Sequence, residues 1–141
     1  RKGRFRVVKW LNYESNKEYI DEVLKVYDLG SNVDFFPNED LGAFIDIKTE
    51  NWIGSGNIDI KETDQELLVA YIDNIVAEDE GVGYGRKMIE CLLFEENVSI
   101  IKGEATEESY GFWNRMGAKF GEYIDAVEGW SFTIFKEDYK P

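Results

Sequence analysis

Three glycines alternate with other residues at Gly81, Gly83 and Gly85, directly ahead of a segment with helical periodicity. Closely spaced glycines in such a turn let several backbone N–H groups point at one anion, and the dipole of the following helix adds to the attraction. This spacing predicts the binding of a phosphate-bearing ligand. A tight turn without any ligand explains the same glycines, and this alternative stays open.

Two common nucleotide-binding motifs are excluded at this turn. A dinucleotide fingerprint requires glycine at the sixth position, which Arg86 occupies, and a P-loop requires Gly-Lys-Ser/Thr, which is missing. Three carboxylates, those of Glu78, Asp79 and Glu80, precede the glycines and would repel a phosphate unless they point into water. The turn therefore combines a backbone that is typical of an anion-binding site with carboxylate side chains that disfavour anion binding.

The chain contains few types of side chain that could transfer a proton in catalysis. It has no histidine and one cysteine, Cys91, which excludes Ser-His and Cys-His catalysis, an internal disulfide and a CxxC zinc site. We expect no metal site. Cys91 falls in the middle of a predicted helix, so we expect it to be buried rather than nucleophilic. Proton transfer must then come from carboxylates, Tyr, Lys or water.

A second segment, "ATEESYGFWNRMGAKFGE" (105–122), combines a strand end, a short helix with adjacent aromatic residues and a new strand. With the glycine turn, it resembles the GCN5-related N-acetyltransferase (GNAT) family. That family has a Gln/Arg-x-x-Gly-x-Gly/Ala turn after its central strand, and residues 80–85 match it here. A later Phe-Tyr-x-x-x-Gly-Phe pattern is matched by residues 112–118. The resemblance covers residues 72–120, and the predicted element order extends it over the chain.

The resemblance implies that the cofactor is acetyl-CoA. The backbone amides of residues 82–86 would hold its pyrophosphate, and the backbone of residues 75–77 would pair with its pantetheine arm. Lys87, with Arg86, would add positive charge. The residues that the resemblance assigns to the cofactor are Ile75, Val76, Ala77, Val82, Gly83, Tyr84, Gly85, Arg86, Thr106 and Trp113.

The implied reaction is transfer of an acetyl group to a primary amine by direct attack in a ternary complex. Asp73, on the predicted central strand, aligns with the family's carboxylate base. Tyr110 is the first choice for the acid, with Tyr84 or water as alternatives. A solvent-facing role for Asp73 and packing roles for the tyrosines stay open.

The chain departs from the family pattern at two positions. Glu80 stands at the Gln/Arg position, and Trp113 replaces the Tyr that often protonates the leaving thiolate. An indole N–H cannot act as a general acid at neutral pH. The alternative function is therefore an inactive acidic module of the same fold that binds a basic or nucleic-acid-binding protein.

The elements that must position these residues follow the order β-α-β-β-β-α-β-α-β-β. Alternating and helical hydrophobic patterns predict strands at 4–11, 41–48, 66–77, 98–105, 121–127 and 130–135. The segment 52–62 is expected to be a turn that enters a strand, and 63–65 a hairpin turn. This order predicts one α/β (α+β) domain over residues 1–141, with a mixed, mostly antiparallel sheet of six to seven strands flanked by helices.

Helix signals accompany this pattern. Ser15 and Glu18 are spaced as a capping box ahead of a first helix, Gly30 is expected to end it, and a loop is expected around Pro37. Thr106 is expected to cap the last helix, with Gly117 following its end. The hydrophobic residues at helical spacing in the first two helices are Ile20, Val23, Leu24, Tyr27, Met88, Ile89, Leu92 and Leu93.

The net charge of the chain limits the kinds of partner that it is expected to bind. With 16 basic and 29 acidic residues among 141, the formal net charge is −13. This charge disfavours nucleic acid and anionic membrane, and favours a cationic amine-bearing small molecule or protein, although solubility alone explains it equally well. No leader and no membrane-spanning run is visible, so we expect a cytoplasmic protein; a homodimer is left open. The acidic residues expected near an acceptor pocket are Asp34, Glu39, Asp40, Asp125 and Glu128.

Overall fold

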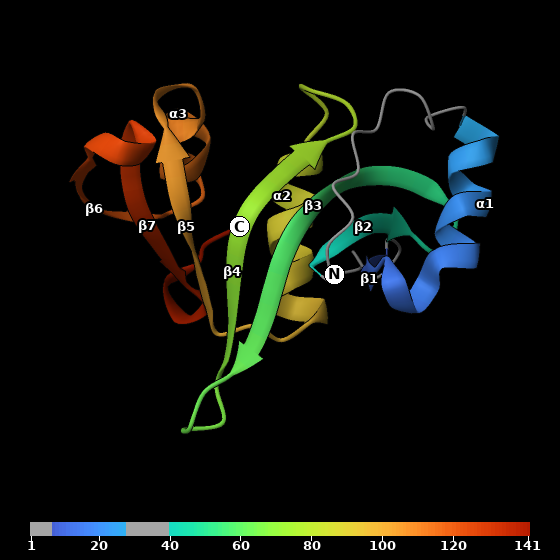
Figure 1. Ribbon diagram of the computed structural model, residues 1–141, viewed down its shortest axis with the longest axis horizontal. Coiled ribbons are helices and arrows are strands. Elements are labelled where there is room, and N and C mark those ends of the chain that lie inside the picture. Colours follow the sequence, from blue (N-terminus) through green and yellow to red (C-terminus); the bar gives the residue numbers. More distant parts are fainter. Residues whose placement is uncertain (1–6, 28–39) are drawn as a thin grey trace. The chain divides into compact units, whose positions relative to one another are not determined.

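The computed structural model describes residues 7–27 and 40–141 (Figure 1). Its strands form a seven-stranded sheet in the order β1-β2-β3-β4-β5-β7-β6. The strands are β1 (Val8–Asn12), β2 (Leu41–Asp46), β3 (Asn51–Glu62), β4 (Leu68–Ala77), β5 (Ile100–Thr106), β6 (Lys119–Ile124) and β7 (Gly129–Phe135). The main helices are α1 (Lys17–Tyr27), α2 (Tyr84–Glu90) and α3 (Glu107–Arg115). The predicted element order and the mixed sheet flanked by helices are confirmed.

The sheet is mostly antiparallel, with one parallel pair. Antiparallel ladders join β1 to β2, β2 to β3, β5 to β7 and β6 to β7, whereas β4 and β5 run parallel. The parallel ladder pairs Val69, Ala70 and Tyr71 with residues 100–102, and β4 continues beyond it to Ala77. Hydrophobic residues on both faces of β4 explain its central position in the strand order.

The chain divides into two compact units, which are described separately. Unit 1 comprises Arg1–Ile58 and Asn74–Glu96, and unit 2 comprises Asp59–Asp73 and Asn97–Pro141. None of the helices in the described ranges is long and apolar enough to cross a membrane.

In unit 1, α1 and α2 lie on opposite faces of the sheet. Ile20 and Val23 of α1 form a buried cluster with Ala43, Ile45 and Trp52. The opposite face carries Phe44, whose register partner is Gly54, and there Met88 of α2 packs against the strand. The stripe predicted for this helix is confirmed: Met88 and Ile89 of α2 are buried, and so are Leu92 and Leu93 of the π-helical turn (Cys91–Glu95) that continues it.

The start of α1 differs from the predicted capping box. A 3-10 turn (Glu14–Asn16) precedes α1 and has no side-chain cap from its N-cap residue, Tyr13. Instead, the side-chain oxygen of Asn12 accepts a hydrogen bond from the backbone N–H of Ser15 at 3.1 Å. The prediction of a Ser15–Glu18 box was wrong, because the turn begins two residues earlier, at Tyr13, and the side chain of Asn12 accepts the hydrogen bond from Ser15. Gly30 and Pro37 lie outside the described residues, and so do the side chains of Leu24 and Tyr27, whose backbone belongs to α1.

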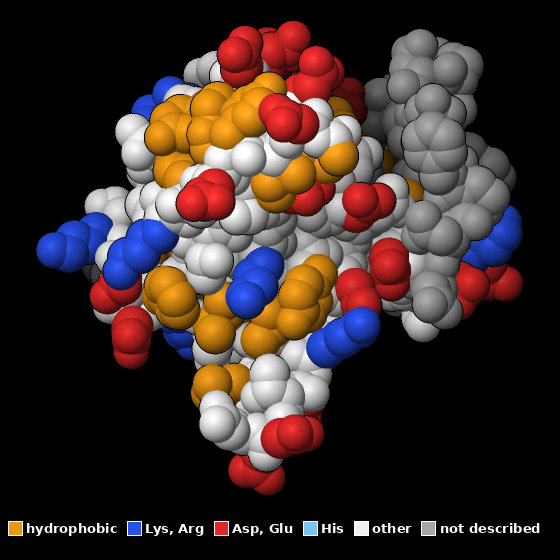
Figure 2. All heavy atoms as spheres, turned by 60° about the vertical axis from the view of Figure 1, so that its left-hand side comes forward, with side chains coloured by type: hydrophobic (Ala, Val, Ile, Leu, Met, Phe, Trp, Pro, Cys, Tyr) orange, Lys and Arg blue, Asp and Glu red, His pale blue; other side chains and the backbone are white. Residues whose placement is uncertain are grey.

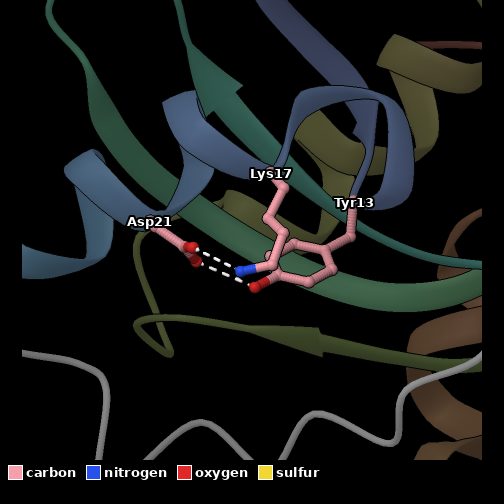
Figure 3. A network of polar contacts seen from close by, with 3 residues as sticks. All are labelled: Tyr13, Lys17 and Asp21. Atoms are coloured by element: carbon pink, nitrogen blue, oxygen red, sulfur yellow. Dashed lines mark hydrogen bonds and ion pairs between the residues drawn. The ribbon is translucent and has the colours of Figure 1, made fainter.

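A polar network joins this turn to α1 (Figure 3). The Tyr13 hydroxyl donates to one carboxylate oxygen of Asp21 at 2.9 Å, and the Lys17 ammonium donates to the other at 3.0 Å. The hydrogen bond to Asp21, followed by that to Tyr13, raises the pKa of Lys17. Because Lys17 is exposed, whereas Tyr13 and Asp21 are half-buried, we expect the ion pair to orient the helix start more than it stabilises the fold.

The segment 52–62 is strand throughout, so the turn expected at its start was wrong. The turn instead lies at 47–50, where buried Asp46 accepts from the backbone N–H groups of Lys48 and Thr49 at 3.1 and 3.3 Å. Gly54 and Gly56 in this segment suggested a turn from sequence. In the structure they allow the end of β4 to approach β3 closely, as described below.

Unit 2 is built around β5 and β7, with α3 on one face. Thr106 caps α3 in a reciprocal box with Ser109, and Gly117 follows its end at φ +84°, so both helix signals are confirmed. The hairpin between β3 and β4 closes at the predicted position, where the Thr63 N–H donates to the carbonyl of Leu67 at 2.8 Å. The buried hydrophobic residues of this unit include Val69, Ile101, Trp113, Phe132 and Ile134.

Candidate functional site

The glycine turn adopts backbone conformations that only glycine takes without strain. Gly81 and Gly83 have φ of +79° and +81°, and a Cβ on either would meet no atom of the residues described here within 4 Å. The glycines are therefore required by the backbone rather than by crowding, and the space beside them is open. The turn is anchored at its start, where the Glu78 N–H donates to the carbonyl of Ile53 at 2.9 Å.

Helix α2 begins directly at this turn. Gly83 is its N-cap and offers no side chain, and the first backbone bond of the helix runs from the Lys87 N–H to the Gly83 carbonyl at 3.1 Å. By helix geometry, the amides of residues 84–86 have no carbonyl within this helix to donate to. The helix continues through a π-helical turn (Cys91–Glu95), so its dipole extends beyond the seven residues of α2. The arrangement is typical of an anion site.

Two glycines of β3 support the strand that leads into the turn. A Cβ on Gly54 would stand 2.5 Å from the sulfur of Met88 and would clash with the carbonyl oxygen of Val76. A Cβ on Gly56 would likewise clash with the carbonyl oxygen of Asn74. These close approaches fix the end of β4 and the start of α2 against β3. Sequence analysis missed this role; the signal was a Gly-x-Gly pair inside a β-rich segment.

The electrostatics of the turn are mixed. The carboxylates of Glu78, Asp79 and Glu80 are all exposed, as expected if they point into water. Partial burial, followed by the charge of Asp79, raises the pKa of Glu78. A positive charge also lies near the turn: the Lys87 ammonium lies over the ring of Tyr84, 5.1 Å from its centroid. The cation–π contact holds one positive charge near the helix start.

Asp73 lies on β4, two residues beyond Tyr71, the last residue of the parallel β4–β5 ladder. Its side chain is exposed, whereas the neighbouring Ile72 is buried, as the alternation of a strand requires. The carboxylate is therefore accessible to a water molecule or an amine. The geometry is compatible with a base and equally with a solvent-facing strand residue.

Tyr110 belongs to an aromatic cluster in unit 2. Its ring stacks on Phe120 with centroids 4.1 Å apart, and its edge meets Trp130 at 4.9 Å. Tyr123 also contacts Trp130 in an edge-on arrangement, with ring centroids 5.2 Å apart. Packing accounts for the position of Tyr110, whose ring is half-buried.

The two remaining residues of unit 2 assigned to the cofactor have structural roles. The Thr106 hydroxyl accepts from the Ser109 N–H at 3.3 Å, which commits it to the helix cap. Trp113 is only 4% exposed and stacks on Phe132 with centroids 4.1 Å apart. The indole is thus part of the core, and the aromatic match to the family motif reflects packing here.

The predicted site residues separate into two groups. Residues 75–77 and 82–86 lie together in unit 1, at the end of β4 and the start of α2. Asp73, Thr106, Tyr110 and Trp113 lie in unit 2.

The acidic residues expected at an acceptor pocket are only partly described. Asp125 and Glu128 are exposed in the β6–β7 turn, and Asp40 precedes β2 with its side chain half-buried. Asp34 and Glu39 lie outside the described residues.

Two further polar side chains are buried in unit 1. Cys91 is buried, as predicted, and desolvation raises the pKa of its thiol to about 12, so it is not a nucleophile at neutral pH. The side-chain oxygen of Asn57 on β3 is buried and accepts no hydrogen bond from any of the described residues. Such an unpaired atom costs folding free energy, and nothing in the sequence pattern indicated it.

Comparison with known proteins gives matches only at the level of structure. No protein-family model and no curated protein matches the sequence. Naa50 from Arabidopsis thaliana, in complex with the bisubstrate analogue CoA-Ac-MVNAL, is 12% identical over 91% of this chain and 98% of its own, with a TM-score of 0.56. A GNAT-family acetyltransferase from Listeria monocytogenes is 13% identical over 92% and 94%, with a TM-score of 0.56. A chimera of spermidine N-acetyltransferase SpeG from Vibrio cholerae is 12% identical over 94% and 98%, with a TM-score of 0.55.

These likenesses cover nearly the whole chain. They show that the protein has the fold of the GCN5-related N-acetyltransferases, which confirms the fold that the two motifs predicted.

Proposed function

We propose that this protein is an acetyl-CoA-dependent N-acetyltransferase that acts on a primary amine. The observation that carries the proposal is the glycine turn: two left-handed glycines with open space beside them lead directly into a helix without a side-chain cap. This is the backbone that a pyrophosphate requires, and it stands between a strand and a helix in the shared fold. The CoA-containing analogue bound to Naa50 supports the choice of ligand.

In this proposal the backbone amides of residues 82–86 bind the phosphates of acetyl-CoA. The backbone of residues 75–77 pairs with the pantetheine arm. The ligand supplies an acetyl thioester. The exposed carboxylates of Glu78, Asp79 and Glu80 leave the amides accessible but weaken the binding of a polyanion.

The chemical step requires one base and one acid. The Asp73 carboxylate takes a proton from the acceptor ammonium, directly or through water, and the amine nitrogen attacks the thioester carbonyl. The C–S bond breaks, and Tyr110, Tyr84 or water protonates the leaving thiolate. The net charge of −13 favours a cationic acceptor, such as a polyamine, a lysine or a peptide N-terminus.

The direct test is calorimetric titration with acetyl-CoA of the wild type, Gly83→Glu and Gly117→Glu. Gly117 is a matched control, because it has φ of +84° and open space around a Cβ, but lies after α3. We expect Gly83→Glu to lower the affinity by about 100-fold or more, and Gly117→Glu to change it by less than about threefold. Equal losses would mean that the effect is general destabilisation, and no wild-type binding at millimolar acetyl-CoA would remove the proposal.

One observation favours a second function, that of an inactive acidic binding module. Trp113 stands at the position where the family often has the Tyr that protonates the leaving thiolate. It is buried against Phe132, and its indole cannot act as that general acid. This reading predicts no acetyl-CoA binding and retained affinity for a basic partner.

A further inference from the structure

The sheet of unit 2 presents different side chains on its two faces. On one face, Phe132 of β7 stacks on Trp113 of α3. Because the side chains of a strand alternate between the faces, Thr133 lies on the other face, together with its register partners Lys102 of β5 and Lys119 of β6. We define the lysine row by these three residues, by Tyr71 of β4, which pairs with Lys102, and by Lys61 of β3, whose ammonium lies over the Tyr71 ring.

The lysine row combines positive charge with aromatic surface. Its three lysines are exposed, and Tyr71 is 44% exposed, which is high for a large hydrophobic side chain. The Lys61 ammonium lies 5.8 Å from the centroid of the Tyr71 ring, and the Lys119 ammonium lies 5.4 Å from that of Phe135. Figure 2 shows Lys and Arg side chains among hydrophobic ones in the lower half of the view. A partner can therefore meet cations and apolar groups side by side.

The charge of the row is opposite in sign to the net charge of the chain, which is −13. Lys61 pairs with Asp59 at 3.2 Å, and Lys119 pairs with Asp138 at 3.4 Å. Both pairs are exposed, so they contribute little and can be exchanged for carboxylates of a partner. Lys102, on the strand between the two, forms no ion pair with any residue in the described ranges. The centre of the row therefore offers a positive charge that its neighbours do not neutralise.

Carboxylates border the row on one side. Asp73 and Glu104 lie two residues beyond Tyr71 and Lys102 on the same strands, and therefore on the same face, and both are exposed. An acidic segment that ran along these strands would meet repulsion there. A segment that crosses the strands instead meets the three lysines one after another.

The spacing of the lysines fits an extended chain. In the strand order β3-β4-β5-β7-β6, the lysines of the row stand on every second strand. Neighbouring strands lie about 4.8 Å apart, so the strands that carry the lysines are about 9–10 Å apart. In a polyproline II helix, every third residue points to the same side, and the repeat is about 9.3 Å.

We propose that the lysine row docks an acidic, extended segment of another protein, in which a carboxylate recurs at every third residue. The carboxylates meet Lys61, Lys102 and Lys119, and the residues between them cover Tyr71. Nucleic acid is a poorer occupant, because its many phosphates are repelled by the net charge of −13. A second copy of this chain is also poorer, because two-fold pairing of the row places Lys61 opposite Lys119. No residue of the row is assigned to acetyl-CoA or to the acceptor.

The test uses the full chain and the peptide acetyl-Glu-Pro-Leu-Glu-Pro-Leu-Glu-amide with a C-terminal fluorophore, titrated by fluorescence anisotropy. The peptide contains no primary amine, so it cannot be an acetyl acceptor and reports on docking alone. We expect saturable binding that weakens with rising salt, as contacts between exposed charges require. The peptide acetyl-Glu-Glu-Glu-Pro-Leu-Pro-Leu-amide has the same composition and should bind at least about threefold more weakly, because its carboxylates cannot span the row.

Variants locate the binding. Lys102→Glu should lower the affinity by about tenfold or more, and Tyr71→Ser should lower it by about threefold without a change of charge. The matched control is Lys48→Glu, which makes the same change of charge at an exposed lysine in the turn between β2 and β3. Gly83→Glu serves as a second control, because it alters the glycine turn and leaves the row intact. Both controls should retain affinity within about twofold.

Five results would overturn the proposal. They are absence of binding to the wild type, equal binding of the two peptides, equal losses in Lys102→Glu and Lys48→Glu, tighter binding of a heptathymidylate than of the first peptide, and a wild-type dimer that Tyr71→Ser dissociates. A loss of peptide binding in Gly83→Glu alone would place the peptide at the glycine turn and would equally contradict the proposal. Circular dichroism of each variant establishes that it is folded.

Discussion

Gly54 of β3 and Met88 of α2 lie so close that a Cβ on residue 54 would stand 2.5 Å from the Met88 sulfur. The same Cβ would clash with the carbonyl oxygen of Val76 at the end of β4. The missing side chain of Gly54 therefore sets how near the helix and the strand end approach β3, and with them the position of the glycine turn.

We expect Gly54→Ala to destabilise the protein by about 1–3 kcal/mol, because an extra methyl group in a filled space forces its neighbours apart. Chemical denaturation measures the change. Gly111→Ala in α3 is the control: its Cβ would come no closer than 3.4 Å to the Arg115 guanidinium, and alanine favours a helix. That variant should be neutral or more stable, and the prediction is wrong if both variants behave alike.

Trp113 should matter for stability and not for proton transfer, because it is buried and stacked on Phe132. We expect Trp113→Ala to cost about 3–5 kcal/mol in unfolding free energy, from lost apolar burial and the cavity left behind. Trp113→Tyr restores the family residue but places its hydroxyl in the core. Its kcat with any accepted amine should not rise, and a clear increase would show that the position reaches the leaving group.

Asp73→Asn tests the proposed base. Removal of a general base should lower kcat by roughly 10²–10⁴-fold. The KM for acetyl-CoA should stay unchanged, because residue 73 precedes the segment assigned to the pantetheine arm. Glu104→Gln, at an exposed carboxylate on β5, is the control. Unchanged kcat in Asp73→Asn would leave water or another group as the base.

The three carboxylates before the glycines should weaken acetyl-CoA binding. Asp79→Asn and Glu80→Gln should each raise the affinity by a few-fold to about tenfold at low salt, and the gain should shrink at high salt. Asp64→Asn and Glu66→Gln in the β3–β4 hairpin are the controls for net charge. No gain at positions 79 and 80 would mean that these side chains are too far from the phosphates to act.

Glu78 adds a pH dependence whose sign follows from its raised pKa. A carboxyl whose pKa is higher in the folded than in the unfolded protein contributes stability at low pH, and this contribution is lost as the pH rises through the folded pKa. Glu78→Gln removes the titration. The variant should therefore gain stability relative to the wild type as the pH rises above the acidic range, measured by thermal unfolding across pH. A constant difference at all pH values would contradict the prediction.

The element order could be predicted from the sequence because strands and helices have different periods. Met88, Ile89, Leu92 and Leu93 follow the helical period, and all are buried. The glycine turn was also identified correctly as a strand-to-helix connection, in which Gly81 and Gly83 have positive φ.

The incorrect predictions concern residue types that occur in more than one structural role. Glycine indicates a turn in sequence, but Gly54 and Gly56 lie inside β3, where a neighbouring backbone leaves no room for a Cβ. Ser15 has the type and spacing of a cap, but Asn12 occupies that role from the preceding strand. The buried oxygen of Asn57 depends on which neighbours surround it, and such neighbours are remote in sequence.

The π-helical turn at Cys91–Glu95, closed by the bond from the Glu96 N–H to the Cys91 carbonyl at 2.9 Å, has a consequence for changes in chain length. A π turn holds one residue more than an α turn, so deleting one residue there lets the helix relax to α while everything on either side keeps its orientation. The same deletion within α2 would rotate all later side chains by about 100° and remove the buried stripe from the core. Homologues one residue shorter should thus carry their gap after Glu90, and a helix of uniform pitch in its place.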